Sequence, residues 1–122
     1  MNWQMRYDEN EQIIFIKTNG ILEITSANYM RAEGAALIKE HNCMRLLLDH
    51  SGFVSDALST MEIYDLPRRY EEMGLTRQLK MALVIPHEFV ENLRFYETVC
   101  RNNGYSVQLF SDHDLALKWL KE

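Results

Sequence analysis

The chain has 122 residues, of which 47% are hydrophobic, 25% charged and 11% aromatic, and these values are typical of one globular domain over residues 1–122. The 13 Lys and Arg against 18 Asp and Glu give a net charge of −5, which argues against nucleic acid as a partner. No hydrophobic run approaches the roughly 20 residues that span a bilayer, and the first residues show no signal-peptide pattern, so we expect a cytoplasmic protein that is not integral to a membrane.

The N-terminal part of the sequence predicts a β-hairpin followed by a helix. Residues 3–7 and 12–18 are predicted as strands around a polar turn, and Asn19-Gly20 is expected to close the second strand. Ser26 is the predicted N-cap of a helix that extends to about residue 40. The hydrophobic stripe of this helix contains Ala27, Met30, Gly34, Leu37 and Ile38.

A short hydrophobic strand, a long connection and a capped helix are predicted next. The strand covers residues 44–49, and the connection, residues 50–58, is the longest in the chain. The helix at 59–73 opens with Ser59-Thr60-Met61-Glu62, which is the pattern of a capping box. Pro67 is expected either to kink this helix or to begin a second short one.

The C-terminal part predicts two further strand–helix units. Residues 80–85 form the most continuously hydrophobic strand, which we expect at the centre of the sheet. A helix at 88–103 and a strand at 106–110 follow, and Ser111-x-x-Asp114 is predicted to open the last helix. The residues of the last helix expected to face inward are Leu115, Ala116, Trp119 and Leu120.

The resulting order, β-β-α-β-α-β-α-β-α, predicts an α/β protein. Strands that alternate with helices require crossover connections, which favour parallel pairing and right-handed crossovers. The first hairpin adds an antiparallel pair, so the expected sheet is mixed and mostly parallel. Cys43 and Cys100 have neither a Cys-x-x-Cys nor a zinc spacing, and we expect two reduced, buried thiols.

Three histidines that follow predicted strands form a candidate metal site. His50, His87 and His113 could converge, because the carboxyl ends of parallel strands meet at one edge of a sheet. With Asp49 or Asp112 they would offer nitrogen and oxygen ligands suited to zinc or another divalent ion. Solvated loop histidines are the alternative reading, because the spacing matches no metal motif. No catalytic residue and no cofactor is assigned.

The connection at residues 50–58 is the main candidate for a binding site. It contains Phe53 and Val54, hydrophobic residues that a solvent-exposed loop does not require. Phe53 would either form a lid or partner contact, or pack onto the core. The candidate partner- or ligand-binding residues are Asp49, His50, Ser51, Phe53, Ser55, Asp56, Ser59 and Thr60.

Phe95 is a candidate for self-association. It projects roughly 120° from the centre of its helix's hydrophobic stripe, on the flank that also carries Val99. Such a side stripe indicates a homodimer or a partner contact, although single exposed aromatic residues are common on protein surfaces.

The sequence as a whole resembles the STAS domain, and more closely the SpoIIAA-like (STAS/SEC14-related) small bacterial proteins. The resemblance covers essentially the entire chain, and it implies a SpoIIAA-like fold and a non-catalytic regulatory or ligand-binding module. It rests on the strand ending in Leu47-Leu48-Asp49, on Ser59-Thr60-Met61-Glu62 with Tyr64-Asp65-Leu66-Pro67, on the strand Lys80-Met81-Ala82-Leu83-Val84, and on the ending Ala116-x-x-Trp119-Leu120.

The resemblance also implies a phosphorylation site. In anti-sigma-factor antagonists, a serine that starts the helix after the third strand is phosphorylated by a partner kinase, and Ser59 and Thr60 occupy the nearest position here. The family's Asp-Ser-Ser/Thr-Gly signature is missing, because residues 55–60 read Ser-Asp-Ala-Leu-Ser-Thr. A role as helix cap is the alternative explanation of Ser59.

These observations lead to three hypotheses. The leading one is a STAS-like regulatory module that binds a protein partner through residues 50–58 and the start of the following helix, Ser59 to Glu62. The alternative is a domain that binds a small molecule or a lipid in an apolar pocket under that loop, as the SEC14-type relatives imply. The third is a metal-dependent enzyme that uses the strand-end histidines.

Overall fold

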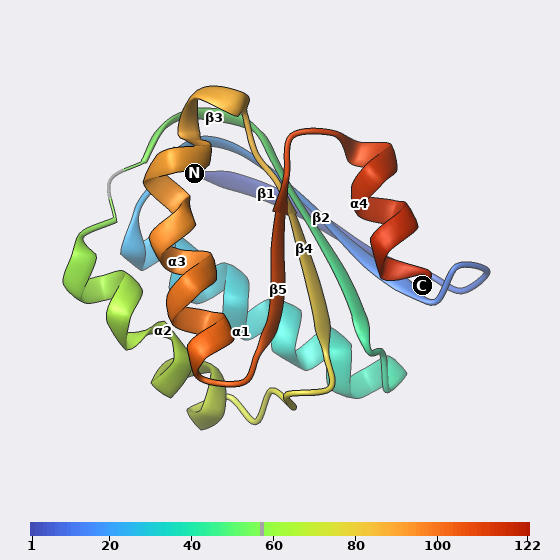
Figure 1. Ribbon diagram of the computed structural model, residues 1–122. Coiled ribbons are helices and arrows are strands. Elements are labelled where there is room, and N and C mark those ends of the chain that lie inside the picture. The colour runs from blue at the N-terminus through green and yellow to red at the C-terminus, as the bar shows by residue number, and fades with distance from the viewer. Residues whose placement is uncertain (57) are drawn as a thin grey trace.

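The computed structural model describes residues 1–56 and 58–122, with all of their side chains except those of residues 55 and 56, and over these residues it contains a five-stranded sheet and four α-helices (Figure 1). The strands are β1 (Asn2–Asp8), β2 (Ile13–Leu22), β3 (Arg45–Asp56), β4 (Lys80–Val84) and β5 (Ser106–Phe110). The helices are α1 (Ile24–His41), α2 (Thr60–Glu72), α3 (Val90–Asn102), which follows the 3-10 turn η1 (His87–Phe89), and α4 (His113–Leu120).

The strands lie in the sheet in their sequence order, β1-β2-β3-β4-β5. β1 pairs with β2 in antiparallel orientation, and the three other pairs are parallel. Crossover connections between sequential neighbours place α1, α2 and α3 on one face of the sheet, while α4 covers the other (Figure 1). The predicted α/β class, element order and mixed sheet are confirmed.

Each strand divides its side chains between two hydrophobic layers, because successive residues point to opposite faces. On β3, Leu46 and Leu48 pack in the larger layer, and Leu47 lies in the smaller layer beside Ala116 and Leu120 of α4. The two cysteines, Cys43 and Cys100, are free and buried, as predicted. None of the helices in the described part of the chain is long and hydrophobic enough to span a membrane.

β2 continues beyond its predicted end at residue 18. Gly20 does not stop the strand, because at φ +105 it adopts a conformation that favours glycine, next to a shift in the β2–β3 register. The strand runs to Leu22, and α1 therefore begins at Ile24 with Glu23 as its N-cap. The Glu23 carboxylate accepts hydrogen bonds from the backbone N–H groups of Thr25 and Ser26, so the predicted Ser26 cap is wrong.

β3 is the largest departure from the prediction, because most of the expected connection 50–58 is strand. It pairs with β2 as far as Asp56, with two register shifts. Asn19 pairs with Gly52, Gly20 with Phe53, and Ile21 with residue 55, which leaves Val54 as an extra residue in a β-bulge. The bulges interrupt the alternation of hydrophobic and polar residues that marks a strand in a sequence.

The remaining helices differ from prediction only in detail. α2 keeps its capping box and runs through Pro67 without interruption. α4 is capped by Asp112, whose carboxylate accepts from the N–H groups of Asp114 and Leu115, rather than by Ser111. Leu115 is 57% exposed, so its predicted burial is wrong.

Candidate functional site

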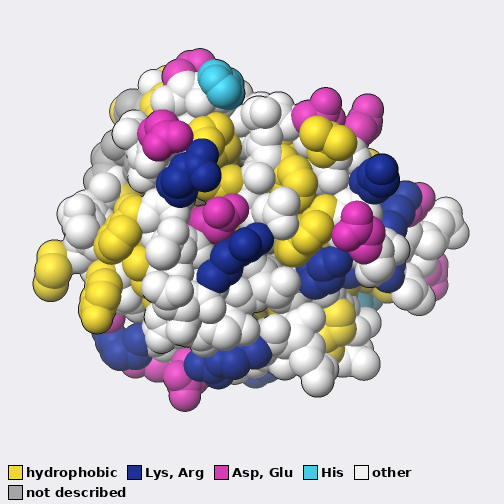
Figure 2. All heavy atoms as spheres, in the orientation of Figure 1, with side chains coloured by type: hydrophobic (Ala, Val, Ile, Leu, Met, Phe, Trp, Pro, Cys, Tyr) yellow, Lys and Arg dark blue, Asp and Glu magenta, His cyan; other side chains and the backbone are white. Residues whose placement is uncertain are grey.

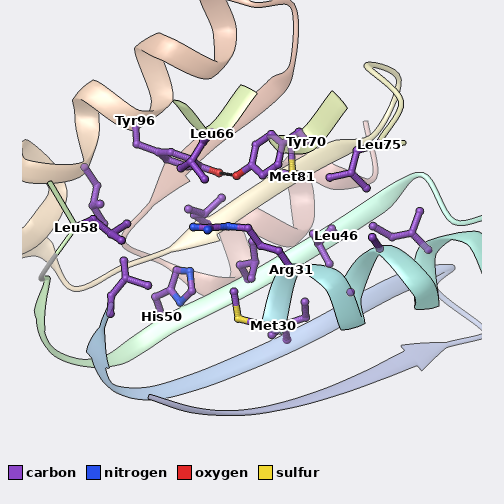
Figure 3. A pocket seen from close by; sticks show the side chains of 18 residues that line it. Met30, Arg31, Leu46, His50, Leu58, Leu66, Tyr70, Leu75, Met81 and Tyr96 are labelled. Atoms are coloured by element: carbon purple, nitrogen blue, oxygen red, sulfur yellow. Dashed lines mark hydrogen bonds between the residues drawn. The ribbon is translucent and has the colours of Figure 1, made fainter. Parts of the chain in front are cut away.

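A cavity of about 50 Å³ lies between the sheet and the helices α1, α2 and α3 (Figure 3). Most of its wall is aliphatic, and we call it the helix-side cavity. Its lining includes Met30, Leu46, Leu58, Leu66, Leu75 and Met81, together with the polar side chains of Arg31, His50, Tyr70 and Tyr96.

Arg31, on the second turn of α1, points its guanidinium into this cavity (Figure 3). The group lies between the Tyr70–Tyr96 pair on one side and His50 on the other (Figure 3). The guanidinium donates a hydrogen bond to the Asn28 side-chain oxygen at 3.2 Å, and the Tyr70 hydroxyl is a second polar neighbour of the group. Among the described residues, no carboxylate lines the cavity, and none forms a salt bridge with Arg31.

Two tyrosine hydroxyls form the opposite polar wall of the cavity. Tyr70 of α2 and Tyr96 of α3 are buried, and their hydroxyl oxygens are hydrogen-bonded at 2.6 Å (Figure 3). Burial raises the pKa of Tyr70 to about 12, and it also raises the pKa of Tyr96 well above its ordinary value. Both phenols are therefore neutral at physiological pH, and each can donate a hydrogen bond.

His50 is buried on the same side of the sheet. Its Nδ1 and the hydroxyl of buried Thr18 are joined by a 2.6 Å hydrogen bond, and its ring stacks on Phe53 with 4.4 Å between centroids. Burial is the main cause that lowers the pKa of His50 to about 3, and the charge of Arg31 acts in the same direction. His50 is therefore neutral at physiological pH and adds no second positive charge to the cavity.

The predicted binding residues of β3 are divided between the two faces of the sheet. His50 and Phe53 point toward the helix layer, and Phe53 is 6% exposed, so it packs onto the core. Asp49 pairs instead with Lys17 at 3.4 Å, and the Lys17 ammonium also donates to the Ser51 hydroxyl. The side chains of residues 55 and 56, also predicted as binding residues, lie outside the described part of the structure.

Ser59 and Thr60 stand at the exposed start of α2. The Ser59 hydroxyl accepts from the Glu62 N–H at 3.1 Å, and the Glu62 carboxylate accepts from the Ser59 N–H at 3.4 Å, which confirms the predicted capping box. This arrangement satisfies backbone donors that would otherwise have no partner at the helix start.

Three large hydrophobic side chains within a few residues of Ser59 in the sequence are exposed. Val54 at the end of β3 is 69% exposed, and Met61 and Tyr64 on the first turns of α2 are 78% and 70% exposed. Figure 2 shows hydrophobic side chains protruding at the left of the view, where Figure 1 places α2. We call Val54, Met61 and Tyr64, with Ser59 and Thr60, the β3–α2 surface.

The strand-end histidines do not come together. His50 is buried under the helix layer, while His113 begins α4 on the opposite face and stacks on Phe15. His87 is exposed in η1. Within the described residues, no group of three or more His, Cys, Asp or Glu side chains is placed to hold a metal ion. The proposed convergence of these histidines is therefore wrong, because β3 buries one of them and α4 carries another to the far face.

Sequence reasoning missed Arg31, the one charged side chain in the described lining of the cavity. A signal was present, because Arg31 falls between Ala27 and Gly34 at spacings of four and three residues, in line with the hydrophobic stripe of α1. A cation at such a position of a helix that packs on a sheet must either reach solvent or enter the protein interior.

Comparison with solved structures shows a SpoIIAA-like fold. An anti-sigma factor antagonist from Mycobacterium paratuberculosis superposes with a TM-score of 0.66 at 12% identity, over 99% of this chain and 96% of its own. The anti-sigma factor antagonist SpoIIAA in its unphosphorylated form gives a TM-score of 0.60 at 12% identity, over 98% of each chain.

A third structure is that of an uncharacterized protein with a SpoIIAA-like fold from Shewanella loihica. It gives a TM-score of 0.59 at 14% identity, over 98% of this chain and 92% of its own. No protein-family profile matches the sequence, and no curated protein matches it significantly. The fold predicted from the sequence is thus confirmed by structures that share little sequence with this chain.

Proposed function

We propose that the chain is a single cytoplasmic domain that acts without catalysis, as a regulatory module that binds a protein partner through the β3–α2 surface. The observation that carries the proposal is the exposure of Met61 and Tyr64, each more than two-thirds accessible to solvent. They stand three residues apart on α2, so their side chains are neighbours on one helix face.

The chemistry of this surface fits a protein partner with a hydrophobic groove. Single exposed hydrophobic residues are common, but Met61 and Tyr64 are neighbours on one helix face, and exposed Val54 on the preceding strand adds a third hydrophobic side chain that a partner can contact. Burial of a methionine side chain contributes roughly 1.5–3 kcal/mol, and exposed tyrosines are frequent anchors of interfaces. Two of the structures that share the fold are named as antagonists of anti-sigma factors, and a protein partner for this chain agrees with that.

The proposal is tested by affinity measurements on surface variants. The partner is first captured from lysate of the host with the tagged protein, and its dissociation constant is then measured. Met61→Asp and Tyr64→Asp should each weaken binding at least about tenfold, because a carboxylate would be placed in a desolvated contact. Leu115→Asp is the matched control, because Leu115 is a comparably exposed hydrophobic residue on α4. Equal binding by all three variants and the wild type would reject the β3–α2 surface.

Phosphorylation of Ser59 or Thr60 is a proposed means of regulating this contact. A phosphate there would be favoured by the positive end of α2, yet it would place about two negative charges beside the exposed side chains of Met61 and Tyr64. Thr60→Glu should therefore weaken partner binding while the helix remains folded, and Thr60→Gln serves as the uncharged control. Equal affinities of the two variants would reject an electrostatic switch.

A second candidate function is the binding of a small apolar molecule. The helix-side cavity favours it, because the wall is mainly aliphatic and Leu58, beside the β3–α2 connection, is part of that wall. A ligand in this cavity would contact α1, α2 and α3 together.

A further inference from the structure

We propose that the helix-side cavity binds an aliphatic monocarboxylate, whose carboxylate group is held by Arg31 and the hydroxyls of Tyr70 and Tyr96. The proposal deepens the second candidate function, because it names the chemical class of the apolar molecule. It does not depend on partner binding at the β3–α2 surface.

A permanent positive charge lies in the helix-side cavity. Arginine stays protonated in proteins, so Arg31 brings a full charge into a cavity whose other lining residues are mostly aliphatic. Arg31 is only partly exposed, and the part of its charge that is withdrawn from water is costly unless an opposite charge compensates it. Within the described lining no Asp or Glu supplies that compensation, and the neutral oxygens of Asn28 and Tyr70 are weaker partners than a carboxylate.

Hydrogen-bond donors surround the space next to the guanidinium. Tyr70 and Tyr96 share one hydrogen bond, so one of the two hydroxyl protons is not used between them. That proton and the planar N–H fork of Arg31 can point at the same acceptor (Figure 3). A carboxylate has two oxygens with about four acceptor sites, which matches the fork and one further donor.

The charge of the cavity lining favours a ligand with a single negative charge. Arg31 is the only cation among the described lining residues, and buried His50 is neutral at physiological pH. A monocarboxylate matches this charge of +1, whereas a phosphate dianion would leave a second charge without a partner in an apolar wall.

The size of the cavity limits the hydrocarbon part. Its volume is about 50 Å³, whereas cavities of about 150 Å³ hold benzene. A short chain fits with small movements of the wall, and a longer one requires larger displacements of the lining side chains. We therefore use butanoate, hexanoate and octanoate as probes, with butanol, hexanol and octanol as their neutral counterparts.

The experiment is an NMR titration of the ¹⁵N-labelled protein with each acid and each alcohol at pH 7. For at least one acid we expect saturable shifts at residues that line the cavity, with an affinity at least about tenfold higher than that of the matching alcohol. Arg31→Met should reduce the affinity for the acid at least about tenfold while it leaves the affinity for the alcohol within about twofold.

Two further variants separate loss of the charge from loss of the fold. Arg94→Met removes an exposed arginine from α3 that pairs with Glu91, and it should bind the acids as the wild type does. Tyr70→Phe removes one hydroxyl and keeps the ring, and it should weaken binding of the acid but not of the alcohol. The amide spectrum of each ligand-free variant reports whether the fold is intact.

The outcomes distinguish this proposal from the functions on which it builds. Equal affinities for acid and alcohol, or an unchanged affinity for the acid in folded Arg31→Met, would overturn the role of Arg31 and leave an apolar ligand possible. Absence of binding by all six probes would overturn the proposal together with the second candidate function. Neither result would alter the evidence for partner binding, which is measured on Met61 and Tyr64.

Discussion

Phe53 and Val54 are consecutive residues of β3 with opposite environments. Phe53 is 6% exposed, stacks on His50 and meets the Phe89 ring edge-on, with 6.4 Å between ring centroids. Val54 is 69% exposed because it is the extra residue of a β-bulge. One strand thus places an anchor in the core and a contact residue on the surface.

The first prediction concerns this pair. Phe53→Ala should lower the free energy of unfolding by about 3–5 kcal/mol, because it leaves a cavity beneath the helix layer. Val54→Ala should change it by less than about 0.5 kcal/mol, because little of that side chain is buried. Urea denaturation measures both values, and a cost for Val54→Ala equal to that for Phe53→Ala would contradict their assigned environments.

The second prediction concerns pH and His50. Burial lowers the pKa of His50 to about 3, whereas in the unfolded chain it binds a proton below about pH 6.5. Between these values the unfolded state binds more protons than the folded state, so stability falls as the pH is lowered. Between pH 6.5 and pH 5, proton binding to His50 in the unfolded state should lower the free energy of unfolding by an amount on the order of 2 kcal/mol.

Replacement of the imidazole tests this assignment. Between pH 7 and pH 5, the free energy of unfolding should fall less in His50→Gln than in the wild type, and the difference should be on the order of 2 kcal/mol. Urea denaturation at the two pH values gives the difference directly. An identical loss in both proteins would mean that His50 is accessible to protons in the folded state.

At the scale of elements, the start of α2 combines a stabilising cap with an exposed contact. Ser59 and Glu62 form the capping box. Met61, which lies between these two residues in the sequence, has an exposed side chain. The cap holds the first turn in place, so the exposed side chains are presented from an ordered helix rather than from a loop.

The third prediction follows from this cap. Ser59→Ala should cost about 1 kcal/mol of stability, because it removes the acceptor of the Glu62 N–H. Thr60→Ala should cost less than about 0.5 kcal/mol, because Thr60 is exposed and its side chain has no role in the capping box. Thermal unfolding of the two variants measures the difference. Equal melting temperatures would show that the box does not stabilise α2.

The elements that the sequence predicted well are those with regular periods. Hydrophobic residues at helical spacing identified α2 and α3, and the uninterrupted hydrophobic run of β4 identified a strand inside the sheet. The expected central position of β4 is wrong, because β3 is the middle strand and β4 lies between β3 and β5. The errors fall where local signals compete with sheet pairing. Asn19-Gly20 is a usual turn signal, but pairing with β3 continues through it as a bulge.

The candidate site was predicted in part, for a physical reason. The start of α2 was found because a capping box is a local pattern, so Ser59 and Glu62 suffice to identify it. The helix-side cavity was not found, because it depends on how three helices meet over the sheet. Arg31, Tyr70 and Tyr96 belong to separate helices, and their proximity arises only from tertiary packing.

At the scale of the whole molecule, self-association through Phe95 is the fourth prediction. Phe95 is 40% exposed on α3, whereas Val99, expected on the same flank, is buried, so the exposed area is smaller than the sequence indicated. If the protein forms a dimer through this face, Phe95→Glu should convert it to a monomer. Sedimentation velocity measures the change, and an unchanged sedimentation coefficient would reject this face as the interface.

The molecule thus carries two separable candidate sites on one sheet. The β3–α2 surface is exposed to solvent, and the helix-side cavity lies in the interior. Each includes a residue at or beside the start of α2: Met61 belongs to the surface, and Leu58 belongs to the cavity wall. Partner binding is nevertheless the central claim, and it can be measured without any ligand.

The most direct test of that claim is site-specific photo-crosslinking in the host cell. A photoreactive amino acid in place of Tyr64 should yield a discrete adduct with one partner protein, and the adduct should disappear when Met61→Asp is added. The same amino acid in place of exposed Leu115 on α4 should yield no such adduct. Identical adducts from both positions, or no adduct from position 64, would contradict a partner-binding role for the β3–α2 surface.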